Sequence, residues 1–374
     1  MKSRALFAIP IGLSLAGFAA AAGYSQQNLV SDGAVSAAHV DPDLKNPWGI
    51  SFGSSTPFWI SDNGTGLSTL YDGSGAKQSM VVTVPPVPGS PVGTKSSPTG
   101  TLSNGSSGFM SDKFLFATEQ GTIAGWQSGT TGSVRVNNAA GGAVYKGLAI
   151  SGNRIYASDF GNGRVDVFDS TYAPAALAPG AFVDGSLPSG FAPFNVQEIG
   201  GAIYVTYAKQ GPTGDDVSGP GNGFVDKFDT NGSLLQRLII GIPGDANSPL
   251  NSPWGITVAP ASFGELSGLL LVGNFGDGKI NAFNPTTGAF VKTLTDAKGD
   301  PLVIDGLWAL AFGNGSAGFD PSKLYFTAGP NEEANGLFGS LGVIPEPATV
   351  VLLSAGLMVL FVARQRHARP RQAS

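Results

Sequence analysis

A four-residue motif, Pro-Trp-Gly-Ile, occurs twice in this chain and constrains its fold more than any other feature. The copies are residues 47–50 and 253–256, and each is followed by a second apolar run and a glycine-rich turn. Two copies with the same downstream pattern indicate an internal repeat. A repeat must be found before a fold is assigned, because each unit buries its apolar face only against its neighbours.

Four weaker copies of this tetrad begin at Pro98, Tyr145, Pro193 and Leu307. Successive copies, counted from Pro47, start 51, 47, 48, 60 and 54 residues apart. Each is followed by a second short apolar run, and most by a third, with Gly, Asn, Asp and Ser between them. Such runs separated by turn residues are typical of strands. The sequence therefore predicts an all-β fold, a six-bladed β-propeller over residues 23–344.

The last of the six units, residues 308–344, contains only three predicted strands. A further run, Asn28-Leu29-Val30, lies near the N-terminus outside all six units. We expect this N-terminal strand to complete the last unit and close the ring, because closure removes a pair of exposed strand edges. A hydrophobic content of 42% with 10% aromatic residues favours a packed core over disorder.

Charge and cysteine content exclude several functions. Without residues 1–22 and 346–374, the chain has 15 basic and 25 acidic residues, a net charge of −10. An acidic surface poor in lysine is unsuited to a phosphate backbone, so nucleic acid is not an expected partner. The chain has no cysteine, which excludes disulfides and thiolate metal ligands, and its two histidines are His39 and His367.

Residues 1–22 have the pattern of a secretory signal peptide. Lys2 and Arg4 precede a short apolar run, and alanines at 19–22 form an Ala-x-Ala cleavage site. A membrane anchor is the alternative, but the apolar run is short and ends in small residues. We therefore expect export with cleavage near Ala22.

Residues 345–374 differ in character from the rest of the chain. Pro345, Glu346 and Pro347 precede 16 uncharged residues, 348–363, and then a cluster of four arginines. As a helix the apolar run is about 24 Å long, which spans a bilayer with some local thinning, and the arginines place the tail in the cytoplasm. A permanent tail anchor explains the span and the arginines but not the Pro-Glu-Pro motif.

This three-part end resembles the PEP-CTERM sorting signal of Gram-negative bacteria. The resemblance implies recognition by an exosortase and the secretion machinery, cleavage near Pro-Glu-Pro, and a membrane-anchored intermediate. It implies delivery to the cell envelope or to an exopolysaccharide matrix. The stretches 41–50, 62–66 and 305–315 also resemble an uncharacterised bacterial propeller family often fused to such tails, and the units are more distantly similar to NHL repeats. That likeness implies a fold and an address, but no activity.

The residues at and just before the tetrads are the candidate binding residues. The tetrads begin the strands that line the channel of a propeller, so these side chains are expected near one mouth. Aromatic rings stack on sugars or peptides while Asn and Asp exchange hydrogen bonds with them. Alternatively, the tryptophans pack between adjacent blades and the polar residues cap their own loops. The candidates are Asn46, Trp48, Asn251, Trp254, Asp305 and Trp308.

Two readings of the function remain. The first is a non-enzymatic binding or structural module whose partners are polysaccharide or envelope proteins; it is preferred. The second is a metal-dependent hydrolase of the lactonase type, which needs carboxylates converging in the channel, where Glu198 is the obvious candidate. The turns at Asp62, Asp159 and Asn274 suggest calcium, but they are spread one per blade and hairpin geometry explains them better. No catalytic residue, metal ligand or cofactor is assigned.

Overall fold

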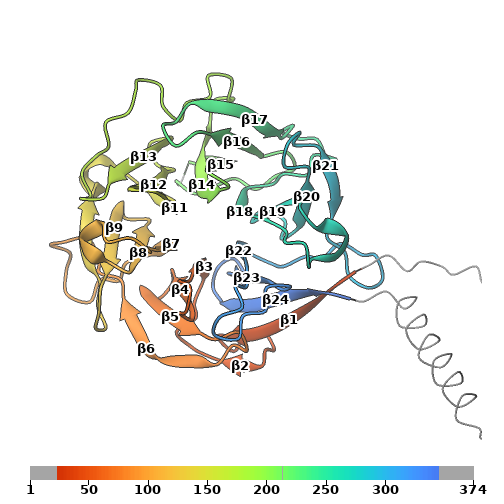
Figure 1. The fold of residues 1–374 in the computed structure, drawn as a ribbon, viewed down its shortest axis with the longest axis horizontal. Helices are drawn as coiled ribbons and strands as arrows, with labels where there is room; N and C mark the ends of the chain where they lie inside the picture. Colours follow the sequence, from red (N-terminus) through yellow and green to blue (C-terminus); the bar gives the residue numbers. More distant parts are fainter. Residues whose placement is uncertain (1–22, 213, 345–374) are drawn as a thin grey trace, which may run out of the picture. The chain divides into compact units, whose positions relative to one another are not determined.

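Six sheets are arranged in a ring around a central channel in the computed structural model (Figure 1). The structure describes residues 23–212 and 214–344. All strands of the ring lie within the compact unit formed by residues 23–343, which contains its own core and closure and so has what the ring needs to fold by itself. The predicted six-bladed β-propeller is confirmed.

Each of the first three blades runs outward from an inner strand that begins in a tetrad. Blade 1 is β3 (Pro47–Ser51), β4 (Phe58–Asp62), β5 (Leu67–Tyr71) and β6 (Lys77–Thr83). Blade 2 is β7 (Pro98–Ser103), β8 (Phe114–Thr118), β9 (Thr122–Trp126) and β10 (Ser133–Asn137). Blade 3 has three strands, β11 (Tyr145–Ser151), β12 (Arg154–Asp159) and β13 (Arg164–Asp169).

The other three blades follow the same plan, and blade 6 has two additional strands from the start of the chain. Blade 4 is β14 (Phe191–Ile199), β15 (Ala202–Lys209), β16 (Gly223–Phe228) and β17 (Leu234–Ile240). Blade 5 is β18 (Pro253–Val258), β19 (Leu270–Asn274), β20 (Ile280–Phe283) and β21 (Phe290–Thr293). Blade 6 is β22 (Leu307–Phe312), β23 (Leu324–Ala328), β24 (Leu337–Val343), β1 (Tyr24–Ser31) and β2 (His39–Val40).

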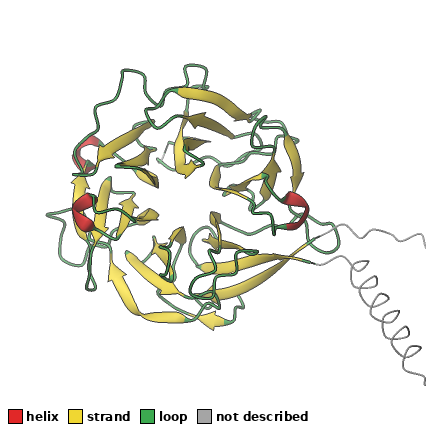
Figure 2. Cartoon of the chain, viewed as in Figure 1, coloured by secondary structure: helices red, strands yellow, loops and turns green. Residues whose placement is uncertain are grey.

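Helical structure in the described part of the chain is limited to three single turns (Figure 2). They are the 3-10 helices η1 (Phe109–Ser111), η2 (Ala139–Gly141) and η3 (Gly264–Leu266). None of these turns is long and apolar enough to cross a membrane. The predicted signal peptide, residues 1–22, and the sorting segment, 345–374 with its apolar run 348–363, lie outside the described residues.

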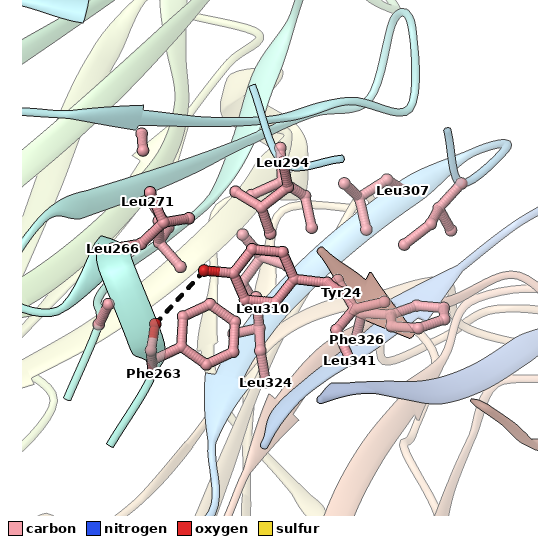
Figure 3. Packing of buried hydrophobic residues seen from close by; sticks show 14 of the residues in the cluster. Tyr24, Phe263, Leu266, Leu271, Leu294, Leu307, Leu310, Leu324, Phe326 and Leu341 are labelled. Atoms are coloured by element: carbon pink, nitrogen blue, oxygen red, sulfur yellow. Dashed lines mark hydrogen bonds between the residues drawn. The ribbon is translucent and has the colours of Figure 1, made fainter. Parts of the chain in front are cut away.

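The N-terminal strand closes the ring as predicted. β1 pairs with β24 in antiparallel register from Tyr24↔Val343 to Ser31↔Leu337. Tyr24 also reaches the neighbouring blade, where its ring stacks on Phe263 with centroids 4.7 Å apart and its hydroxyl donates to the Phe263 carbonyl oxygen at 3.3 Å (Figure 3). This strand therefore covers the edge of β24 and contributes to the apolar cluster between blades 5 and 6.

A β-bulge interrupts the pairing of every inner strand at its tetrad. In β3 the register with β4 shifts between Pro47 and Ile50, and the five other inner strands shift at the corresponding place. A bulge bends a strand and redirects one side chain. Here the redirected position is the second residue of each tetrad, which lies at the channel.

Glycine at the third tetrad position permits neighbouring inner strands to approach closely. A Cβ atom on Gly49 would lie 2.6 Å from the carbonyl oxygen of Thr99 in blade 2, and one on Gly255 would lie 2.5 Å from that of Trp308 in blade 6. Because backbone atoms cannot give way as a side chain can, only glycine fits this spacing. The recurrence of Pro-Trp-Gly-Ile thus reflects packing between blades.

Tyrosine, aspartate and a basic residue meet repeatedly at the buried polar positions of the blades. In three places a tyrosine hydroxyl donates to an aspartate that also pairs with a lysine or arginine. Blade 4 differs, because the fully buried carboxylate of Asp226 accepts no hydrogen bond while Arg237 pairs with Asp184. The three complete groups are Tyr71–Asp41–Lys77, Tyr172–Asp112–Arg135 and Tyr145–Asp166–Arg164.

Candidate functional site

The second tetrad residues converge on the axis of the ring and close one end of the channel. Five of them are large, and each is at most 4% exposed. They come from blades 1, 3, 4, 5 and 6, so side chains close one end of the channel whose surrounding strands Figure 1 shows as a ribbon. We call this group the plug: Trp48, Lys146, Phe194, Trp254 and Trp308.

The three tryptophans of the plug pack on one another. Trp48 and Trp308 stack with ring centroids 3.5 Å apart and planes 19° from parallel. Trp254 packs edge-on against both rings, at 6.1 Å from Trp48 and 5.8 Å from Trp308. Both geometries are favourable for aromatic quadrupoles. Blades 1 and 5 are not neighbours in the ring, so the contact between Trp48 and Trp254 crosses the axis.

A buried ammonium group completes the plug. Nζ of Lys146 lies 5.0 Å from the centre of the Trp48 ring, 2.6 Å from Glu119 Oε1 and 3.1 Å from Asp215 Oδ1. Burial alone would lower the pKa of this lysine, but the two carboxylates outweigh burial and raise it. The ammonium is therefore charged at neutral pH, and its charge is matched within the protein.

Amide and carboxyl groups from the connecting loops surround Lys146 at this end of the channel. Asn46 donates from Nδ2 to Glu333 Oε2 at 2.8 Å and accepts from Trp308 Nε1 at 3.1 Å. Asn63 donates to Glu119 Oε2 at 3.0 Å. Burial, with added repulsion from Glu119, raises the pKa of Glu333 to about 7.

The structure brings four of the six predicted binding residues together and places two elsewhere. Asn46, Trp48, Trp254 and Trp308 are in or beside the plug, packed on protein groups. Asn251 accepts from the Gly219 amide at 2.7 Å, and Asp305 accepts from the Asn331 amide at 2.8 Å. These two residues therefore fasten loops to the ends of their inner strands.

Lys146, Glu119 and Glu333 are not among the binding residues predicted from the sequence. Lys146 occupies the second position of a weak tetrad copy, Tyr-Lys-Gly-Leu, so its position in the repeat was a usable signal. Glu119 and Glu333 lie in loops of variable length, where the repeat provides no register.

The turns considered for calcium are bonded within their own blades. Asp62 accepts from the Thr69 amide at 3.0 Å, Asp159 from the Val144 amide at 3.0 Å, and Asn274 donates to the Pro249 carbonyl oxygen at 3.0 Å. Across residues 23–212 and 214–344, no group of three or more His, Cys, Asp or Glu side chains is placed to hold a metal ion.

The opposite end of the channel is an open pocket, which we call the funnel. Its volume is about 540 Å³, and all six blades line it with the last residues of their inner strands. Most of its lining residues are aliphatic or aromatic, but polar atoms make up as much of its exposed wall as apolar atoms do. Its lining residues are Ile50, Ser51, Phe52, Thr101, Leu102, Ser103, Leu148, Ala149, Ile150, Gln197, Glu198, Ile199, Ile256, Thr257, Val258, Pro260, Leu310, Ala311 and Phe312.

Toward the plug the funnel narrows to a neck made by one side chain from each blade. Beyond the neck is a chamber of only about 40 Å³, whose lining includes Gly49, Asn195 and Trp254. The chamber has room for a few atoms, and the plug lies behind it. The channel is thus closed at one end. The neck is Ile50, Thr101, Leu148, Gln197, Ile256 and Leu310.

Comparison with known proteins identifies relatives and a fold, but no protein-family model matches the chain. A glucose dehydrogenase structure aligns with a TM-score of 0.50 at 13% identity, covering 85% of this chain and 99% of that one, which shows a shared fold. One uncharacterized protein of Acanthamoeba polyphaga mimivirus is 34% identical over 333 residues, covering 84% of this chain and 78% of the relative. A second from the same virus is 34% identical over 330 residues, covering 84% of each. This chain therefore belongs to the same protein family as these two mimivirus proteins.

Proposed function

We propose that this protein is an exported, non-enzymatic binding module that holds a small ligand in the funnel. One observation carries the proposal: the channel is open at one end, where most of the lining residues are aliphatic or aromatic, and closed at the other by a plug whose ammonium is already paired with carboxylates. A pocket of about 540 Å³ is within the range of small-molecule sites, which are concave, mostly apolar and supplied with a few polar groups.

Burial of apolar surface supplies the driving force for such binding. Removing apolar area from water contributes about 25 cal/mol per Å², so a ligand that covers the partly exposed side chains of Phe52, Ile150 and Phe312 gains affinity without any charged contact. The exposed amide of Gln197 in the neck then selects the orientation of the ligand, since the Thr101 hydroxyl is already bonded to Ser51 and to the Leu115 carbonyl oxygen.

The arrangement of Lys146 favours binding over the alternative, a metal-dependent hydrolase of the lactonase type. Such an enzyme needs carboxylate and amide oxygens that converge on a divalent cation. At the plug end, Glu119 and Asp215 converge on the Lys146 ammonium instead, so the oxygens that a metal would need are already paired with a cation of the protein itself.

Export and sorting remain part of the proposal. The order of basic, apolar and Ala-x-Ala segments in residues 1–22 supports a cleaved signal peptide. In residues 345–374, the Pro-Glu-Pro motif, the apolar run and the arginines follow in the order of a sorting signal. This order supports a membrane-anchored intermediate that an exosortase processes and that reaches the envelope or an exopolysaccharide matrix of a Gram-negative bacterium. The expected partners of the exported protein are then envelope proteins or polysaccharide. Intact-mass analysis of the exported protein tests both cleavages, and a chain that retains residues 1–22 contradicts export by this route.

The binding proposal is tested with a neutral fluorescent apolar probe, N-phenyl-1-naphthylamine, added to residues 23–344. We expect one saturable site. Val258→Trp fills the funnel wall and should abolish this site, whereas Val303→Trp, at a position 58% exposed outside the funnel, should leave it intact. Equal melting temperatures for the two variants exclude unfolding as the cause. Absence of a saturable site, or a site that survives Val258→Trp, contradicts the proposal.

A further inference from the structure

We propose that the ligand of the funnel is an amphiphilic amine, with an apolar body in the funnel and a protonated amino group paired with Glu198. This inference rests on the proposed function and adds the chemical class of the ligand. Glu198 is the one ionisable residue among those that line the funnel. Every other lining side chain is apolar or neutral, so the site has a single fixed charge.

The repeat shows that this charge is an exception. Counted from the first residue of each tetrad, the sixth residue of the inner strand region lines the funnel in all six blades. Only in blade 4 is this residue acidic. A position that repeats is normally occupied for the sake of the repeat, and departures from such a local rule concentrate at functional sites. The six residues are Phe52, Ser103, Ile150, Glu198, Val258 and Phe312.

The contacts of Glu198 leave half of its carboxylate available. Oε1 accepts a hydrogen bond from the Gly201 amide at 2.6 Å in the turn that joins β14 to β15. Within residues 23–212 and 214–344, Oε2 has no hydrogen-bond donor and no basic side chain beside it. The backbone contact therefore fixes the carboxylate, while its second oxygen stays unpaired at the wall of the funnel.

Charge complementarity selects the ligand class. A ligand that covers the funnel also displaces water from Glu198, and a carboxylate that loses water without gaining a partner opposes binding. A protonated amine restores the lost interaction, a neutral ligand does not, and a carboxylic acid adds repulsion. The single carboxylate of the funnel lining cannot supply the six to eight oxygens that calcium requires. The geometry thus favours an ammonium group on an apolar body.

The alternative is that Glu198 serves only to hold the turn at Gly200 and Gly201, which both have positive φ angles. Glu198→Gln separates the two roles. The glutamine side chain retains an oxygen that accepts from the Gly201 amide but removes the charge. If Glu198 only holds the turn, this variant should therefore keep the properties of the wild-type chain. If Glu198 binds an amine, the variant should lose its preference for amine ligands.

The experiment compares three rigid ligands that share one shape: 1-adamantanamine, 1-adamantanol and 1-adamantanecarboxylate. Each ligand is titrated at pH 7 into a protein comprising residues 23–344 with the neutral probe bound, and the displacement of the probe is measured. We expect the amine to bind about fivefold more tightly than the alcohol and the acid more weakly than either. In Glu198→Gln the amine should fall to the affinity of the alcohol, while the alcohol and the melting temperature stay unchanged. Raising the salt concentration from about 50 mM to about 1 M should weaken only the amine.

The outcomes separate this inference from the function on which it rests. If the probe and the alcohol bind but the amine has no advantage, or keeps its advantage in Glu198→Gln, the amine inference is wrong and the funnel remains a binding site. If neither the probe nor any adamantane derivative binds, the proposed function fails and the inference fails with it. If Glu198→Gln lowers the melting temperature, the salt dependence of the wild-type chain decides the question alone.

Discussion

The Lys146 ammonium lies 5.0 Å from the centre of the Trp48 ring, although the two residues belong to blades that are not neighbours. The contact forms because the tetrad bulges direct both side chains toward the axis. Glu119 and Asp215 approach the same ammonium from two further blades. A single positive charge thus links blades 1 to 4.

Replacing this lysine should destabilise the ring. Lys146→Met leaves Glu119 without its cation and beside Glu333, with only the Asn63 amide, among the described residues, bonded to it. Breaking a buried ion pair from one side costs about 3–5 kcal/mol, and we expect about 3 kcal/mol here because Glu119 is partly exposed. The pKa of Lys146 is raised in the folded state, so its contribution is complete at pH 7 and is lost only as the pH rises through that folded-state value. Denaturant unfolding at pH 7 measures the loss. Lys113→Met, at an exposed lysine that lies over Trp126, is the control and should change stability by less than about 1 kcal/mol. Equal losses in both variants contradict the role of the plug.

A methyl group at the third tetrad position should disrupt the packing of neighbouring inner strands. Gly49→Ala places Cβ 2.6 Å from the Thr99 carbonyl oxygen, which is backbone and cannot rotate away. We expect a loss of about 1–3 kcal/mol, the usual range for overpacking. Gly185→Ala is the control, since a Cβ atom there meets nothing within 4 Å. Thermal unfolding of both variants gives the comparison, and a Gly49→Ala protein as stable as Gly185→Ala would show that the strands can separate freely.

Asp226 should make stability depend on pH near neutrality. Burial, with added repulsion from Asp184, raises the pKa of Asp226 to about 7 in the folded protein, against about 3.9 when unfolded. The folded state then binds the extra proton between these values, so stability falls as the pH rises from about 4 to 7 and is constant above. The loss amounts to up to about 4 kcal/mol.

Asp226→Asn removes this proton linkage. The variant should be more stable than the wild-type chain at pH 8 and should differ little from it at pH 4.5. Urea unfolding at the two pH values measures the difference in slope. If the stability of the wild-type chain instead rises between pH 5 and 7, and Asp226→Asn shows the same rise, this role of Asp226 is contradicted.

The N-terminal strand should be essential for closure. Tyr24→Ala removes a buried ring from the cluster between blades 5 and 6, at a cost of about 3–5 kcal/mol. Tyr24→Phe removes only the hydrogen bond to Phe263 and should cost about 1 kcal/mol or less. Deleting residues 23–32 exposes the edge of β24 and should cause aggregation, which size-exclusion chromatography detects. A soluble deletion variant with the wild-type melting temperature would show that β1 does not close the ring.

The sequence by itself determined the number of blades and the closure. Every blade packs its inner strand in the same way, so the same pattern recurs: a bulge, a side chain directed toward the axis and, in four of the six blades, a glycine where the next strand comes close. The third position is Asn195 in blade 4 and Ala309 in blade 6. Copies such as Tyr-Lys-Gly-Leu at Tyr145 were recognisable because glycine is required there by backbone contact, whatever stands before it. The missing strand of the last unit followed from counting, because a ring leaves no free edge.

Only the tertiary structure decided what the channel is. The repeat places Trp48, Lys146 and Trp254 in equivalent positions, but equivalence does not say whether such side chains face a ligand, lie between blades or meet on the axis. Contacts across the axis depend on the radius of the ring, which no local pattern encodes. The same holds for Glu198, whose free oxygen faces a funnel that all six blades line, and for Asp226, whose pKa is raised by burial and by Asp184 from the loop that precedes blade 4.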